Sequence, residues 1–197
     1  MKVNNEITLR IQGEMEQFKQ SLKDKGYEEK EHFILYDTFM VPEKLEIEKM
    51  ETREILAKAI IIRKVEDITK NEIRQDISYK IKKFNEQGEI LEQKSIRLKI
   101  LNCEEAEKFM EAIRYTKLMN IIEKDYVYEK KGFSLATKEV IGGDNMIEVE
   151  TELRDARYDT VKKLQDKLKQ ENLPLDFTDC FVKKAEVELN KILGRDI

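Results

Sequence analysis

The last predicted strand of this chain, residues 146–152, alternates between apolar and acidic positions. Successive side chains of a strand point to opposite faces, so one face carries the less polar residues and the other carries three carboxylates. These carboxylates belong to Glu148, Glu150 and Glu152. Carboxylates this close repel one another unless a divalent cation or a basic wall lies between them. The same alternation is typical of an antiparallel strand whose acidic face is in solvent, so both interpretations stay open.

Seven further segments are predicted to be strands, and most of them also carry charged residues on one face. They are residues 5–12, 32–41, 59–65, 77–84, 96–100, 121–129 and 133–141. Glycine-containing turns at residues 86–89 and 130–132 predict two hairpins. Residues 142–145 then turn the chain into the acidic strand.

Apolar residues recur at helical spacing in four other segments. These are residues 14–25, 102–113, 153–168 and 181–192, whereas residues 43–58 are charged and ambiguous. Gly26 is a typical helix end. Asn102 is expected to cap the second helix, and Glu105 follows at the spacing of a capping box. Asp176 or Thr178 is expected to cap the last helix, after the interruption by Pro174.

This order of elements predicts an α+β protein with an antiparallel sheet of about eight strands. An open sheet would leave the charged faces to solvent. A closed or nearly closed eight-stranded β-barrel would instead turn them inward around a polar tunnel, with flanking helices and two C-terminal helices. We expect one domain over residues 1–197, with the strands in 1–152 and the C-terminal helices in 153–197.

Composition excludes several classes of protein. Hydrophobic and charged residues each make up 40% of the 197 residues, which predicts a folded chain with much polar surface. A net charge of −4 argues against a general nucleic-acid binder. The longest aliphatic run, residues 59–62, is too short for a membrane span, and the N-terminus lacks the apolar core of a signal peptide. We therefore expect a cytoplasmic protein without a membrane partner.

Cysteine and histidine are too few for a zinc site of the usual kind. Cys103, Cys180 and His32 are the whole set, which excludes a cluster of histidine and cysteine ligands. Both thiols are expected to be reduced and structural. Nothing near them in sequence supports catalysis by a cysteine–histidine pair.

Six short motifs follow one another in an order that resembles the CYTH superfamily. This family, the triphosphate tunnel enzymes, includes thiamine triphosphatases, inorganic triphosphatases and class IV adenylyl cyclases. The motifs are Glu6-Ile7-Thr8-Leu9-Arg10, Asp37-Thr38-Phe39, Ala59-Ile60-Ile61-Ile62-Arg63, Ser78-Tyr79-Lys80, Ile122-Glu123-Lys124, and residues 143–150 with their closing E-x-E. Together with the two C-terminal helices, they extend the resemblance over nearly the whole chain.

The chain departs from the family pattern at several of its charged positions. Thr8 replaces a glutamate, whereas Lys138 and Arg97 place cations where the family has acids. The other departures are Ile61 and Tyr126, each in place of an arginine, and Ser95, in place of an acid. Fewer carboxylates would hold a metal less well and a polyanion better.

The resemblance implies a tunnel that binds a triphosphate through converging lysines and arginines, with Mg²⁺ or Mn²⁺ between phosphate oxygens and carboxylates. The implied catalytic residues are Arg10 and Lys80. The implied phosphate-binding residues are Arg10, Arg63, Lys80, Lys82, Arg97, Lys124 and Lys138, and the implied metal ligands are Glu6, Glu148 and Glu150. The implied reaction is in-line attack on a phosphoryl group, driven by positioning and charge neutralisation.

Three functions follow from these expectations. The first is a divergent phosphohydrolase acting on a triphosphate-bearing compound with a divalent metal. The second is a catalytically degraded module that binds polyphosphate or a nucleotide without metal. The third is an adenylyl cyclase of the class IV type. The expected partner is a small-molecule triphosphate or polyphosphate, and the formation of a homodimer is left open.

Overall fold

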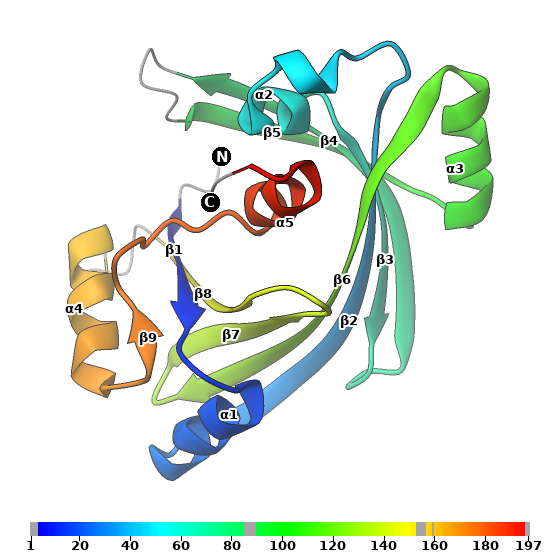
Figure 1. The fold of residues 1–197 in the computed structure, drawn as a ribbon. Helices are drawn as coiled ribbons and strands as arrows, with labels where there is room; N and C mark the ends of the chain where they lie inside the picture. The colour runs from blue at the N-terminus through cyan, green and yellow to red at the C-terminus, as the bar shows by residue number, and fades with distance from the viewer. Residues whose placement is uncertain (1–3, 85–89, 153–156, 159, 196–197) are drawn as a thin grey trace. The chain divides into compact units, whose positions relative to one another are not determined.

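The structure, a computed structural model, describes residues 4–84, 90–152, 157–158 and 160–195 (Figure 1). Within these residues the chain forms one nine-stranded sheet, five α-helices and one 3₁₀-helix. The strands are β1 (Asn4–Ile11), β2 (Glu28–Pro42), β3 (Ile60–Asp67), β4 (Glu72–Phe84), β5 (Ile90–Lys99), β6 (Tyr115–Lys130), β7 (Phe133–Val140), β8 (Asn145–Glu152) and β9 (Leu175–Asp176). The helices are α1 (Met15–Asp24), η1 (Ile47–Lys49), α2 (Thr52–Ala57), α3 (Cys103–Ala112), α4 (Val161–Glu171) and α5 (Lys184–Leu193).

The strands are hydrogen-bonded in the order β5-β4-β3-β2-β6-β7-β8-β1-β9. This confirms the α+β class with a large antiparallel sheet. The sheet has two ends, since β5 and β9 do not pair with each other in the described part of the chain, so a closed eight-stranded barrel is not confirmed. The additional strand, β9, has only two residues and is too short for an alternating pattern to reveal it.

Several elements differ in extent from their prediction. β4 and β6 begin several residues earlier than expected. The first residues of β4, among them the charged Glu72 and Arg74, join the sheet through backbone pairing with β3 rather than through apolar alternation. Neither Asp176 nor Thr178 caps the last helix, which starts at Lys184. Instead, the Asp176 carboxylate accepts hydrogen bonds from the Thr178 backbone N–H and hydroxyl. Residues 85–89, which hold the first predicted turn, and residues 153–156 lie outside the described residues.

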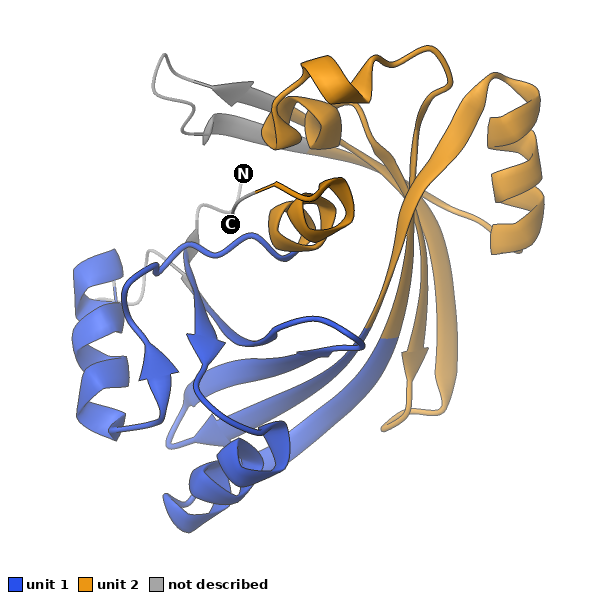
Figure 2. Cartoon of the chain, viewed as in Figure 1, with its two compact units in different colours: residues 1–34, 123–184 blue, residues 35–122, 185–197 orange. Residues whose placement is uncertain are grey.

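The chain divides into two compact units (Figure 2). Unit 1 consists of residues 1–34 and 123–184, and unit 2 consists of residues 35–122 and 185–197. β2 and β6 each contribute to both units, so the units are defined by packing rather than by a linker.

The core of unit 1 lies on one face of β1 and β8, where α1 and α4 contribute apolar side chains. Ile7, Leu9 and Ile11 alternate along β1 and are buried in this core, as the sequence pattern predicts. The core also contains Phe18, Leu22, Tyr128, Leu135, Ile147, Val149, Leu164 and Leu168. The opposite face of the same strands is left for polar residues.

The second edge of β1 is covered by the segment that follows α4. β9 pairs with Arg10 and Ile11 of β1. Further along, the Thr8 backbone N–H donates to the carbonyl of Cys180 at 3.1 Å, and the Val182 N–H donates to the carbonyl of Thr8 at 3.3 Å. β1 therefore has backbone partners on both edges.

One hydrophobic core of unit 2 lies between α3 and the face of β3 that carries Ile62. Ile62 packs there with Met40, Ala106 and Met110. The Asn102 side chain caps α3 by accepting hydrogen bonds from the backbone N–H groups of Glu104 and Glu105, as the sequence predicts.

The two other α-helices of unit 2 are joined by polar contacts. Arg53 of α2 donates to Glu186 of α5 at 2.9 Å, and Thr52 bonds to Asn190. The ambiguous segment 43–58 is thus resolved into η1 and α2, with a capping box between Glu51 and Glu54. No helix in the described ranges is both long and apolar enough to cross a membrane.

Candidate functional site

The predicted site residues are divided between the two units. Unit 1 contains Glu6, Arg10, Lys124, Lys138, Glu148 and Glu150, and unit 2 contains Arg63, Lys80, Lys82 and Arg97. A single site made from all of them stays a prediction. Each unit nevertheless brings several of these residues onto one polar face.

In unit 2, Arg63 of β3 is held by the carboxylate of Asp37 on β2. The Arg63 Nε and Nη2 atoms each lie 2.5 Å from an Asp37 oxygen, so the guanidinium is bound in a two-pronged arrangement. The Asp37 side chain is 1% exposed and the Arg63 side chain is 26% exposed. The pairing therefore fixes a partly accessible guanidinium in one orientation.

Lys80 and Arg97 share this face with Arg63. Arg63 lies directly opposite Asp76 in the β3–β4 register. Lys80 follows Asp76 by four residues along β4, so its side chain is on the same face. Arg97 of β5 forms an ion pair with Asp76 at 3.5 Å. Lys82 pairs with Gln93 along the backbone, but its side chain lies outside the described part of the structure.

Positive charge exceeds negative charge among these residues, which we call the basic face of unit 2. By strand alternation the described side chains of this face include the cations Arg63, Arg74, Lys80, Arg97 and Lys99 and the carboxylates Asp37, Asp67, Glu72 and Asp76. Five cations against four carboxylates leave a local excess of one positive charge. A face of this kind attracts polyanions, and arginine in particular binds phosphate oxygens in pairs.

In unit 1, the polar face holds a buried network of carboxylates and lysines. Lys138 Nζ lies 3.0 Å from Asp125 Oδ2 and 3.7 Å from Glu148 Oε2. Lys184 Nζ lies 2.6 Å from Glu123 Oε1. We call these five residues the carboxylate–lysine cluster. The side chains of Lys138, Asp125 and Glu123 are 13%, 10% and 1% exposed, so the cluster is largely shielded from water.

The cluster has three carboxylates and only two ammonium groups, and this imbalance affects the protonation of its members. Burial raises the pKa of Asp125 to about 6; Lys138 opposes the rise and the neighbouring Glu123 adds to it. Burial also works against the charged form of Lys138, but the attraction of Glu123, Asp125 and Glu148 outweighs it and raises the pKa of that lysine. The cluster therefore favours binding of a proton or another positive charge.

The shifted pKa of Asp125 predicts a pH-dependent effect on stability. An acid with a higher pKa in the folded chain binds more protons when folded, so its contribution to stability falls as pH rises from its ordinary 3.8 to about 6. Asparagine does not titrate, so Asp125→Asn is expected to gain stability relative to wild type between about pH 4 and pH 7. Urea unfolding at several pH values measures this difference. A difference that stays constant, or that shrinks with rising pH, would contradict the assignment.

The three predicted metal ligands do not form a cation site as the structure places them. Glu6 Oε1 is paired with Lys183 at 3.2 Å, and Glu148 lies near the Lys138 ammonium. Glu150 is exposed at the far end of the same face. Within the described residues there is no group of three or more carboxylate, histidine or cysteine side chains that could hold a metal ion. Mg²⁺ or Mn²⁺ at these three glutamates therefore does not fit.

Lys124 lies on the opposite face of β6 from the carboxylate–lysine cluster. Its Nζ is 3.9 Å from Glu139, which also pairs with Lys19 of α1. Lys19 Nζ lies over the ring of Tyr126, 3.8 Å from its centroid, on this helix-covered side of the sheet. The structure therefore does not bring Lys124 together with Lys138 and Glu148. Arg10 is on the polar face and pairs with Asp144 at 3.1 Å.

Sequence reasoning missed Glu123, Asp125 and Lys184 as site residues. Glu123 and Asp125 lie on the face of β6 opposite to Lys124. The sequence does not show which of these faces is the polar one, and the prediction assigned Lys124 to it. Lys184 reaches Glu123 across 61 positions of sequence, and no local pattern could indicate that contact.

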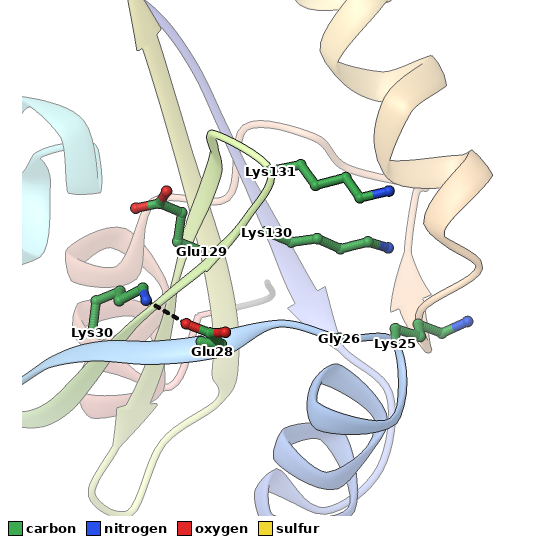
Figure 3. Close-up of a pocket in the computed structure, with 7 residues that line it drawn as sticks. All are labelled: Lys25, Gly26, Glu28, Lys30, Glu129, Lys130 and Lys131. Carbon is green, nitrogen blue, oxygen red and sulfur yellow. Dashed lines mark hydrogen bonds and ion pairs between the residues drawn. The ribbon is translucent and has the colours of Figure 1, made fainter.

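A surface hollow of about 380 Å³ in unit 1 is lined by four lysines (Figure 3). Lys25, Lys130 and Lys131 extend toward the same side of this hollow, and Lys30 is paired with Glu28 at 2.5 Å (Figure 3). Lys130 is also paired with Glu171 at 2.8 Å. The hollow contains none of the residues expected from the family resemblance.

No protein-family model and no curated protein matches this chain. Solved structures do match it over nearly its full length. The PH1819 protein from Pyrococcus horikoshii is 17% identical with a TM-score of 0.65, covering 95% of this chain and 99% of that one. A candidate adenylate cyclase from Vibrio parahaemolyticus is 12% identical with a TM-score of 0.59, covering 96% and 98%.

A further match is HpAC1 from Hippeastrum, a candidate adenylyl cyclase whose structure is presented as revealing a dominant triphosphatase activity. It is 14% identical with a TM-score of 0.60, covering 99% of this chain and 98% of that one. At such identities the likeness establishes the fold alone. The chain therefore has the fold of these proteins.

Proposed function

We propose that this protein binds a compound bearing a triphosphate or a polyphosphate, and that the basic face of unit 2 provides the contacts. One observation carries the proposal: the Arg63 guanidinium is held by Asp37 in a fixed orientation on a face with more cations than carboxylates. A pre-oriented guanidinium loses less side-chain freedom when a phosphate binds than a mobile one does. Lys80 and Arg97 would add further phosphate contacts on the same face.

Hydrolysis of the bound triphosphate is the second candidate function. The likeness to HpAC1, with its triphosphatase activity, favours this over cyclisation. The reaction would be attack of water in line with the phosphoryl group, with the cations of the basic face neutralising charge on the phosphate oxygens. Since Glu6, Glu148 and Glu150 do not fit a metal, no step is assigned to a divalent ion at those residues.

Calorimetry with tripolyphosphate, in EDTA and at two salt concentrations, tests the proposed binding. We expect binding that weakens as salt rises, because the contacts are electrostatic. Lys80→Gln is expected to weaken binding by at least about tenfold, the equivalent of about 1.4 kcal/mol.

The matched control for this measurement is Lys64→Gln. Lys64 lies next to Arg63 but on the other face of β3, where it pairs with Glu66 at 2.6 Å. The control is expected to bind like wild type. Equal losses in both variants would show that general charge, rather than the basic face, determines binding, and no binding by wild type would reject the proposal. Phosphate release that is lost in Lys80→Gln would support the second candidate function.

A further inference from the structure

The carboxylate–lysine cluster contains two buried oxygen atoms for which the structure shows no hydrogen-bond partner. They are Glu123 Oε2 and Asp125 Oδ1, and they lie on one face of β6, two residues apart. Glu123 and Asp125 are 1% and 7% exposed, so water does not freely satisfy these atoms. Buried polar atoms without partners are rare in folded proteins and require an explanation.

The net charge of the cluster limits what these atoms can bind. The carboxylates of Glu123, Asp125 and Glu148 face two ammonium groups, so the cluster has a formal charge of −1 when all are ionised. One proton neutralises it, whereas a divalent cation would make it positive and would lie beside two ammonium groups that already contact the other oxygens. Two lysines and one proton thus balance the charge of the cluster without a metal ion.

We propose that Lys138 takes the place of a divalent cation on the polar face of unit 1. Its ammonium lies among carboxylates of β6 and β8, as a metal ion would, and it stands where the family resemblance places an acid. The inference goes beyond the proposed function, because it concerns the carboxylate–lysine cluster of unit 1 and not the basic face of unit 2.

The same charge balance makes a positive prediction. Replacing Lys138 with glutamine leaves three carboxylates and one ammonium, a formal charge of −2 that matches a divalent cation. Asp125 and Glu148, released from the ammonium, are then available as oxygen ligands. Lys138→Gln is therefore expected to bind Mn²⁺ at least about tenfold more tightly than wild type, which is expected to bind it weakly.

Electron paramagnetic resonance with Mn²⁺ alone measures this, without any phosphate compound. Lys138→Arg retains the positive charge and is expected to show no gain. Lys130→Gln removes a lysine that pairs with a different buried acid, Glu171, and is also expected to show no gain. Wild type that binds Mn²⁺ as tightly as Lys138→Gln would overturn the inference, as would a folded Lys138→Gln without increased binding.

A second variant covers the case in which Lys138→Gln does not fold. Lys184→Gln removes the other ammonium and leaves the same formal charge of −2, so it is expected to gain Mn²⁺ binding too. Circular dichroism identifies which variants are folded. Calorimetry with tripolyphosphate in EDTA then separates the two proposals: wild type without tripolyphosphate binding rejects the proposed function, whereas tight Mn²⁺ binding by wild type rejects only the inference about Lys138.

Discussion

Arg63→Met is expected to lower the free energy of unfolding by about 3 kcal/mol. The substitution removes both guanidinium donors from the Asp37 carboxylate, whose side chain is 1% exposed. A buried charge that loses its partner is costly, and breaking such a pair typically costs about 3–5 kcal/mol. We take the lower end because the Arg63 side chain is 26% exposed, so water already weakens part of the interaction. Urea unfolding at neutral pH measures the loss.

Two further variants show whether the buried pair causes this loss. Lys64→Met breaks an ion pair on the other face of the same strand, where Lys64 is 37% exposed, and is expected to cost less than about 1 kcal/mol. Combining Arg63→Met with Asp37→Leu removes both charges and is expected to recover much of the stability. A double variant that is no more stable than Arg63→Met would mean that packing of the arginine, not its charge, is what stabilises unit 2.

Phe18→Ala is expected to lower the free energy of unfolding by about 3–5 kcal/mol. Phe18 lies in α1, is 1% exposed, and packs in the core of unit 1. Truncating it removes buried apolar surface and leaves a cavity that the neighbouring strands cannot fill completely. Thermal and urea unfolding both report the change.

Phe109→Ala is the control for that substitution. Phe109 lies in α3 and is 61% exposed, so the same chemical change is expected to alter stability by less than about 0.5 kcal/mol. Similar losses in the two variants would contradict the assignment of Phe18 to a closely packed core.

Much of the fold could be predicted because alternation and helical spacing are local patterns. Ile7, Leu9 and Ile11 alternate in sequence and are buried on one face of β1, as expected. Asn102 was expected to cap a helix and does so. Local patterns also placed β7 and β8 within a residue or so of their observed bounds. The sequence pattern does not reveal the early start of β4, because its charged first residues are placed by pairing with β3.

The candidate sites were less predictable because they depend on which charges meet across the sheet. The Asp37–Arg63 pair joins residues 26 positions apart, and sequence reasoning selected Arg63 without recognising Asp37 as its partner. On β6 the pattern did not specify which face is polar, so Lys124 was chosen although the adjacent Glu123 and Asp125 form the cluster. The sequence shows Lys138 as a cation in place of an acid, but only the register of β6, β7 and β8 reveals its carboxylate neighbours.

The backbone partners on both edges of β1 affect how the chain folds during synthesis. Thr8 completes its backbone hydrogen bonds with Cys180 and Val182, residues that leave the ribosome long after β1 does. Until they arrive, one side of β1 presents open donors and acceptors, and an open strand edge is a template for pairing with another chain. Truncation before Cys180 would make that exposure permanent, so shortened forms of this protein should aggregate even though α1 and most of the sheet are still present.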